Sequence, residues 1–250
     1  MTLLSILFLV TAVFYSSVGF GGGSTYLALL LIWGVPYTIF PILALLCNII
    51  VVSGNCFNYI RAGNLNLEIL KYYLIGSIPF AFIGGLITID KRIFEILLFF
   101  ILATAGILLL LNFKSYNDKK LIYKKTSKIF SIIIGAAVGF ISGIVGIGGG
   151  IFLSPILFIL RCGKAQHIVT TASLFILINS ISGIVGHLTK NNILNELFNY
   201  WHLILAVFIG GQIGNFLNLK IISSRVLALI TSLLVIFVTI RLGLKIFNLN

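Results

Sequence analysis

The chain has 250 residues, of which 60% are hydrophobic and 9% are charged. This composition excludes an ordinary soluble domain, in which about a quarter of the residues are charged. The 17 Lys and Arg against 5 Asp and Glu do not indicate nucleic-acid binding, because six of the basic residues lie in one short segment, 114–128, as is typical of a cytoplasmic loop beside membrane helices. We therefore predict one integral membrane domain. Its expected partner is membrane lipid and not nucleic acid.

Apolar segments follow one another along the whole chain. The expected helices cover 3–20, 24–33, 36–60, 67–89 and 93–113 in the first half, and 129–146, 151–161, 165–189, 198–219 and 225–247 in the second. In each half the second segment has only about ten residues, which as a helix rise about 15 Å, half the thickness of the hydrocarbon core. We expect the first two segments of each half to form a re-entrant helical hairpin, followed by three transmembrane helices.

The two halves repeat one sequence pattern. A glycine triplet stands at 21–23 and again at 148–150, each followed by a short apolar run and another glycine. Downstream, "NIIVVSGN" at 48–55 aligns with "LINSISGI" at 177–184, and "FIGG" recurs at 82–85 and 208–211. This pattern indicates an internal duplication of about 125 residues. The expected organisation is membrane repeat 1 over 1–113, a basic cytoplasmic linker over 114–128 and membrane repeat 2 over 129–250.

The orientation of the repeats follows from the number of crossings. A hairpin plus three spans crosses the membrane an odd number of times, so the second repeat is expected to be inverted relative to the first. With the linker in the cytoplasm, twelve Lys and Arg fall on that side against five outside, and both termini face outward. If the first two segments instead form one broken span, the repeats are parallel, and eleven Lys and Arg fall on the cytoplasmic side against six outside. Charge bias leaves both arrangements open, and the short segments favour inversion.

The glycine triplets are the candidate substrate site. A nucleotide-binding loop is not indicated, because Ile151 stands where a dinucleotide fingerprint needs glycine and no Gly-Lys-Ser/Thr follows. In hydrocarbon, non-helical backbone survives only where it is buried in protein or lines a cavity. The short helices begin just after the glycines, so we expect their N-terminal N–H groups to form an anion site near the membrane centre. The expected tip residues are Gly21, Gly22, Gly23, Ser24, Gly148, Gly149 and Gly150.

The helix after each short run carries a polar stripe. Positions 44, 48, 51 and 55 share one face, and their counterparts are 173, 177, 180 and 184. The first copy places Asn48 and Asn55 there, and the second places Ser173 and Ser180. We expect these neutral side chains to line a central cavity, with interhelical hydrogen bonding as the alternative role.

Other glycines indicate helix packing. Gly135, Gly139 and Gly143 are spaced by four residues, as are Gly210 and Gly214. This small-xxx-small spacing lets membrane helices approach closely. Close packing is also the alternative role of the glycine triplets.

Further motifs, "RAGNLN" at 61–66 and "TASLFILINSISGIVGH" at 171–187, complete a family pattern. With the two glycine triplets, the chain resembles the sulfite exporter TauE/SafE family, the TSUP permeases, over nearly its whole length. The resemblance implies inverted repeats whose hairpins meet near the centre, and a cytoplasmic-membrane permease for sulfur-containing oxyanions and organosulfonates such as sulfite or sulfoacetate. Where the family often has Thr-Ser-Leu, this chain has Ala172, Ser173 and Leu174.

The expected function is anion transport by alternating access, without enzymatic activity, cofactor or metal. The five acidic residues lie near predicted helix ends or loops, which fits an anionic substrate. An enzyme would need a nucleophile with its base, or a metal-ligand cluster, within the membrane, and the pattern contains neither. A passive anion channel and an assembly factor for a redox complex remain alternatives. A proton as coupling ion and a homodimeric assembly are left open.

Overall fold

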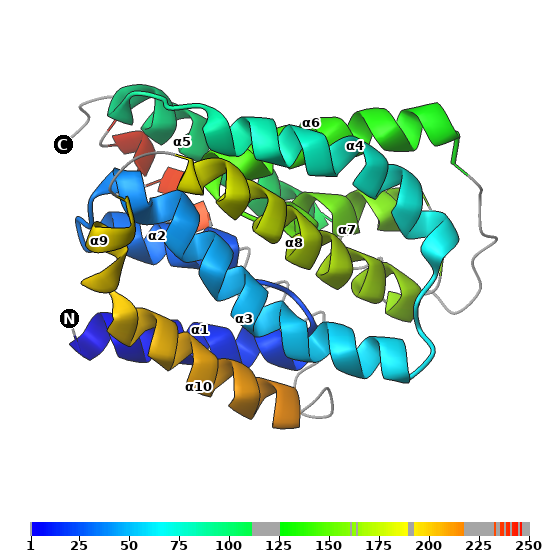
Figure 1. Cartoon of the computed structure of the whole chain (residues 1–250), viewed down its shortest axis with the longest axis horizontal. Helices are drawn as coiled ribbons and strands as arrows, with labels where there is room; N and C mark the ends of the chain where they lie inside the picture. Colours follow the sequence, from blue (N-terminus) through cyan, green and yellow to red (C-terminus); the bar gives the residue numbers. More distant parts are fainter. Residues whose placement is uncertain are drawn as a thin grey trace.

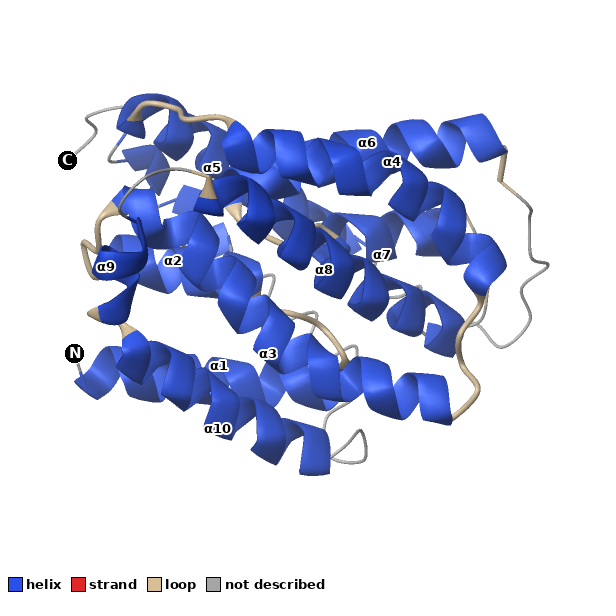
Figure 2. Cartoon of the chain, in the orientation of Figure 1, coloured by secondary structure: helices blue, strands red, loops and turns tan. Residues whose placement is uncertain are grey.

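The computed structural model describes residues 2–111, 126–160, 162–163, 165–189 and 193–217, with scattered positions between 233 and 246. Throughout these residues the regular structure is helical and contains no strand (Figure 2). The all-helical class predicted from the sequence is confirmed. Most of the basic linker and most of the last expected helix, 225–247, lie outside the described residues.

In the first half, the helices keep close to the expected segments. They are α1 (Thr2–Val18), α2 (Gly23–Ile32), the short 3-10 helix η1 (Tyr37–Ile39), α3 (Phe40–Arg61), α4 (Leu67–Leu86) and α5 (Lys91–Leu111). The start of α4 is fixed locally, because the Asn66 side chain accepts hydrogen bonds from the N–H groups of Glu68 and Ile69, as a good N-cap does.

In the second half, one helix was not predicted. The elements are α6 (Lys128–Val145), α7 (Gly150–Ile159), α8 (Ala165–Leu188), α9 (Ile193–Phe198) and α10 (Trp201–Leu217). The unpredicted α9 has six residues, too few for a helical period to show in the sequence. It packs beside η1, where the Thr38 hydroxyl donates to Glu196 at 3.3 Å.

The helices have the length and surface of a membrane protein. Within the described residues, Tyr37–Arg61, Leu67–Leu86, Lys128–Val145 and Gln166–Leu188 are long and apolar enough to cross a bilayer, with mean hydropathy from 1.5 to 2.1. Large apolar side chains such as Phe57, Ile133 and Phe216 stand exposed on the outside. Surfaces of this kind are stable against lipid and not against water. The short helices α2 and α7 have ten residues each, as expected.

The packing joins the two halves throughout. The most extensive contacts join α4 to α6 and α1 to α10, so that the first helix of each half lies against the fourth segment of the other. At the centre, α3 packs against α8, while α2 lies on α3 and α7 on α8. In Figure 1, α1 starts at the end of the molecule where the N terminus lies and α2 returns toward it, whereas α6 starts at the opposite end.

The spaced glycines make these contacts close. A Cβ atom on Gly135, Gly139 or Gly143 of α6 would collide with the backbone of α4. A Cβ on Gly210 or Gly214 of α10 would collide in the same way with the backbone of α1. The packing role predicted for both sets of glycines is confirmed.

Candidate functional site

Both short helices begin at a glycine in the left-handed conformation. Gly22 caps α2 with φ 81°, and Gly149, which holds the same place in the second triplet, caps α7 with φ 78°. Glycine reaches this region at little cost, whereas any residue with a Cβ pays about 1–2 kcal/mol. No side chain in the described residues caps either helix. The sequence thus places a left-handed glycine at the start of both short helices and leaves both N-termini open.

These open helix ends are buried. Gly21 to Ser24 and Gly148 to Gly150 are all buried. The first helical bond of α2 runs from the Tyr26 N–H to the Gly22 carbonyl at 3.0 Å, so the N–H groups before it have no intrahelical partner. Each helix end also carries about half a positive charge. Buried, uncapped N–H groups of this kind are suited to an anion.

The two tips meet at Asn48. This side chain comes from α3, is fully buried, and donates from Nδ2 to the Ile147 carbonyl of the second tip at 3.0 Å. A Cβ on Gly21 would stand 2.5 Å from Asn48 Oδ1, and one on Gly148 would stand 2.7 Å from Asn48 Nδ2. A Cβ on Gly23 would lie 2.7 Å from the Ile147 oxygen. Glycine at these positions is what allows the two tips and the amide to come together.

Helix α8 supplies the opposite side of this meeting point. Ile176 lies against Gly21, Gly148 and Gly150, and the Ser180 hydroxyl would be 3.1 Å from a Cβ on Gly148. Ser180 Oγ and Asn48 Oδ1 are both buried without a hydrogen-bond partner in the described part of the chain. A buried polar atom left unpaired costs about 1–3 kcal/mol. Two such atoms beside two open helix ends make this meeting point the candidate site for a polar ligand.

The other predicted wall residues have protein partners. The Ser173 hydroxyl contacts the Gly19 carbonyl of the first tip and lies 2.9 Å from the Val169 carbonyl of its own helix. Asn55 donates to the Val51 carbonyl at 3.2 Å within α3. Both are buried on the predicted stripe, but their donors are already used, by Ser173 toward the first tip and by Asn55 within its own helix. The structure therefore gathers Asn48 and Ser180 at the tips and leaves Asn55 further along α3.

Sequence reasoning missed two neighbours of the tips. The Tyr59 hydroxyl is buried without a partner among the described residues and would stand 2.5 Å from a Cβ on Gly19. Position 59 continues the face of 48, 51 and 55 by one more turn, so the periodicity already contained this signal. The Ile147 carbonyl is a backbone group, and only the folded structure places it beside Asn48.

The surroundings of the tips carry no full charge. In the described ranges, no Asp, Glu, Lys or Arg is buried. The positive potential at the meeting point therefore comes from the two helix ends, and the hydrogen-bonding groups there are amides and a hydroxyl. This arrangement can hold an anion without covalent chemistry.

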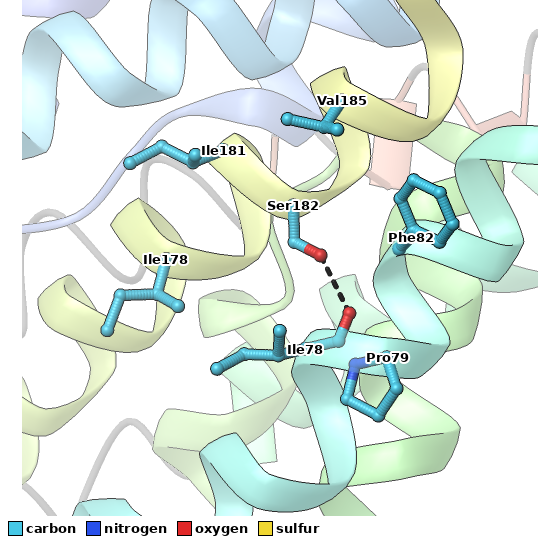
Figure 3. Close-up of a pocket in the computed structure, with 7 residues that line it drawn as sticks. All are labelled: Ile78, Pro79, Phe82, Ile178, Ile181, Ser182 and Val185. Atoms are coloured by element: carbon cyan, nitrogen blue, oxygen red, sulfur yellow. Dashed lines mark hydrogen bonds between the residues drawn. The ribbon is translucent and has the colours of Figure 1, made fainter. Parts of the chain in front are cut away.

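An apolar groove lies on the outer face, between α4 and α8. Figure 3 shows this groove, of about 450 Å³, lined by Ile78, Pro79, Phe82, Ile178, Ile181, Ser182 and Val185. The only polar side chain drawn there is Ser182, whose hydroxyl already donates to the Ile78 carbonyl at 2.7 Å. An apolar groove with no free donor is not suited to an anion, so the tips remain the candidate site.

The chain is similar to known proteins that are named as membrane transporters. The chain is 28% identical over 241 residues to "Probable membrane transporter protein y4hK" of Sinorhizobium fredii, and the alignment covers 96% of each chain. It is 25% identical over 177 residues to "Probable membrane transporter protein YdhB" of Bacillus subtilis, which covers 68% of each. No solved structure gives a significant match. The model of the family "Sulfite exporter TauE/SafE" matches residues 4–242, and the chain therefore belongs to this family of membrane permeases.

Proposed function

We propose that this permease carries small sulfur-containing oxyanions or organosulfonates, of the sulfite or sulfoacetate kind, with the two hairpin tips as its substrate site. The observation that supports this most is Asn48, fully buried between two uncapped helix N-termini. The substrate class follows the name of the family. The proposed site residues are Gly21, Gly22, Gly23, Ser24, Gly148, Gly149 and Gly150, with Asn48 and Ser180 beside them. Asn55 and Ser173 lie on the same polar stripe and support the site through their hydrogen bonds to protein carbonyls.

The proposed mechanism is alternating access between two inverted repeats, 1–113 and 129–250. The contacts support this, because they fall into matching pairs: α1 with α10 corresponds to α6 with α4, and α2 with α3 corresponds to α7 with α8. The opposite starting ends of α1 and α6 in Figure 1 also fit an inversion. Two such halves can rock around a fixed central site. The central basic linker is then cytoplasmic and both termini lie outside.

Transport in proteoliposomes tests the proposal. Purified protein is reconstituted, and uptake and efflux of labelled sulfite, thiosulfate, sulfate and sulfoacetate are measured with and without a pH gradient. We expect saturable movement of at least one sulfur oxyanion. If folded protein moves none of them in either direction, the proposed substrate class is wrong. Counterflow, in which unlabelled anion inside accelerates uptake of label, separates a carrier from a passive channel.

A tip variant connects transport to the site. In Gly149→Ala, the new Cβ would stand 2.8 Å from the Phe175 ring in a backbone with φ 78°, and we expect transport to fall sharply. The matched control is Gly34→Ala, because Gly34 also has positive φ (65°) but a Cβ there would meet open space. Equal transport by both variants would remove the second tip from the site.

A further inference from the structure

The strength of positive charge at the tips limits which anion fits. Each helix N-terminus contributes about half a unit charge, so the two together balance about one negative charge. Within the described residues no Lys or Arg is buried near them to balance a second. A dianion would keep one charge uncompensated in a medium of low dielectric constant, which is costly.

The orientation of the Asn48 amide adds a second requirement. A carbonyl oxygen can only accept a hydrogen bond, so the Asn48 atom that faces the Ile147 oxygen must be the amide nitrogen. The other amide atom, Oδ1, is then an acceptor, and it is the one that lies beside Gly21 without a partner in the described chain. An anion with acceptor atoms only cannot satisfy it.

We propose that the site between the tips selects a monovalent oxyanion that carries its own hydrogen-bond donor. This inference rests on the proposed function and deepens it. The oxygens of the anion face the N–H groups of α2 and α7 and the Ser180 hydroxyl, while its O–H or N–H donates to Asn48 Oδ1. A singly protonated oxyanion such as hydrogensulfite, or a sulfonate with an adjacent amino or hydroxyl group, meets both requirements, and sulfate meets neither.

Three anions of similar size distinguish the effect of the charge of the anion from the effect of its hydrogen-bond donor. Sulfamate is monovalent and carries N–H donors, methanesulfonate is monovalent without a donor, and sulfate is divalent without a donor. Each is tested as a competitor of labelled sulfite uptake and, independently, by calorimetric binding to the purified protein in detergent. We expect sulfamate to bind at least about tenfold more tightly than methanesulfonate, because the latter leaves Asn48 Oδ1 unpaired. Sulfate is expected to bind weakest.

A matched pair of variants assigns the effect to Asn48. Asn179 on α8 is also fully buried, donates to a backbone carbonyl of its own helix and has an unpartnered Oδ1 among the described residues, but it is not among the nearest neighbours of the tip glycines. Asn48→Leu should make the affinities for sulfamate and methanesulfonate about equal. Asn179→Leu should leave the ratio of these two affinities as it is in the wild type. Thermal unfolding in detergent checks that both variants fold.

The outcomes are distinct. Equal binding of sulfamate and methanesulfonate by the wild type overturns the donor requirement, whether or not the variants fold, and is the result expected if a buried water already satisfies Asn48. Tighter binding of sulfate than of both monovalent ions overturns the charge requirement. If no anion, sulfite included, binds or moves, the proposed function itself fails.

Discussion

Glycine serves two purposes in this permease, and the two sets differ in what a side chain would meet. On α6, a Cβ at Gly135 or Gly139 would collide with the backbone of α4. At the tips, a Cβ at Gly21 or Gly148 would meet the Asn48 side chain. The first set brings two helices into contact, and the second brings the backbone of the two tips against a polar side chain. The first set therefore concerns helix packing, and we propose that the second set concerns the ligand.

The largest expected effect comes from Gly148→Ala. The new Cβ would lie within 3.1 Å of Asn48, Ile176 and Ser180 together, and would occupy the place proposed for the anion. If the anion thereby loses two charge-assisted hydrogen bonds to the groups at the tips, sulfite uptake should fall about a hundredfold.

Gly135→Ala is the counterpart of this variant. It should separate α4 from α6 and lower the free energy of unfolding by an amount typical of overpacking, about 1–3 kcal/mol, which a lower thermal unfolding midpoint would report. The KM of the protein that remains folded should stay unchanged. If both variants lower stability and neither changes uptake per folded molecule, the distinction between the two sets of glycines is wrong.

Asn48→Asp is expected to have the next largest effect. The substitution changes size very little but places a carboxyl group beside the proposed anion and removes the donor to Ile147. Repulsion between like charges in a buried site should lower sulfite uptake by about tenfold or more. Uptake equal to the wild type would show that no anion passes beside this residue.

The smallest expected effect distinguishes the roles of two serines on α8. Ser180→Ala removes a hydroxyl without a partner in the described chain, so the KM should rise about fivefold while the unfolding midpoint stays constant or rises. Ser173→Ala breaks the contact with the Gly19 carbonyl and should cost about 1 kcal/mol of stability with an unchanged KM. Melting curves and uptake kinetics on both variants measure this, and the reverse pattern would exchange the two roles.

Much of the fold could be predicted because its signals are local. The paired triplets predicted two ten-residue helices, and α7 begins at Gly150 within one residue of the expectation. Boundaries without such a signal were less accurate: 67–89 was expected where α4 ends at Leu86, because Ile87 is extended although the apolar pattern continues. The six-residue α9 gave no periodicity at all.

The candidate site was predictable in its residues but not in its contacts. The shared face of 48 and 55 predicted a polar stripe, yet nothing in the sequence tells that Asn48 contacts both tips while Asn55 bonds within its own helix. Ser173 and Ser180 are likewise equivalent as sequence, and only the folded chain gives the first a carbonyl partner. These differences depend on how α3, α8 and the tips pack, which is a tertiary property.

If an anion binds between the two tips, a crystal structure of the protein with hydrogenselenite should locate it there. This ion is monovalent, carries a proton, resembles hydrogensulfite and scatters X-rays anomalously. We expect an anomalous peak next to Asn48, between Gly21 to Gly23 and Gly148 to Gly150. A peak elsewhere in the protein, or none at the tips in a preparation that transports the ion, would contradict this expectation.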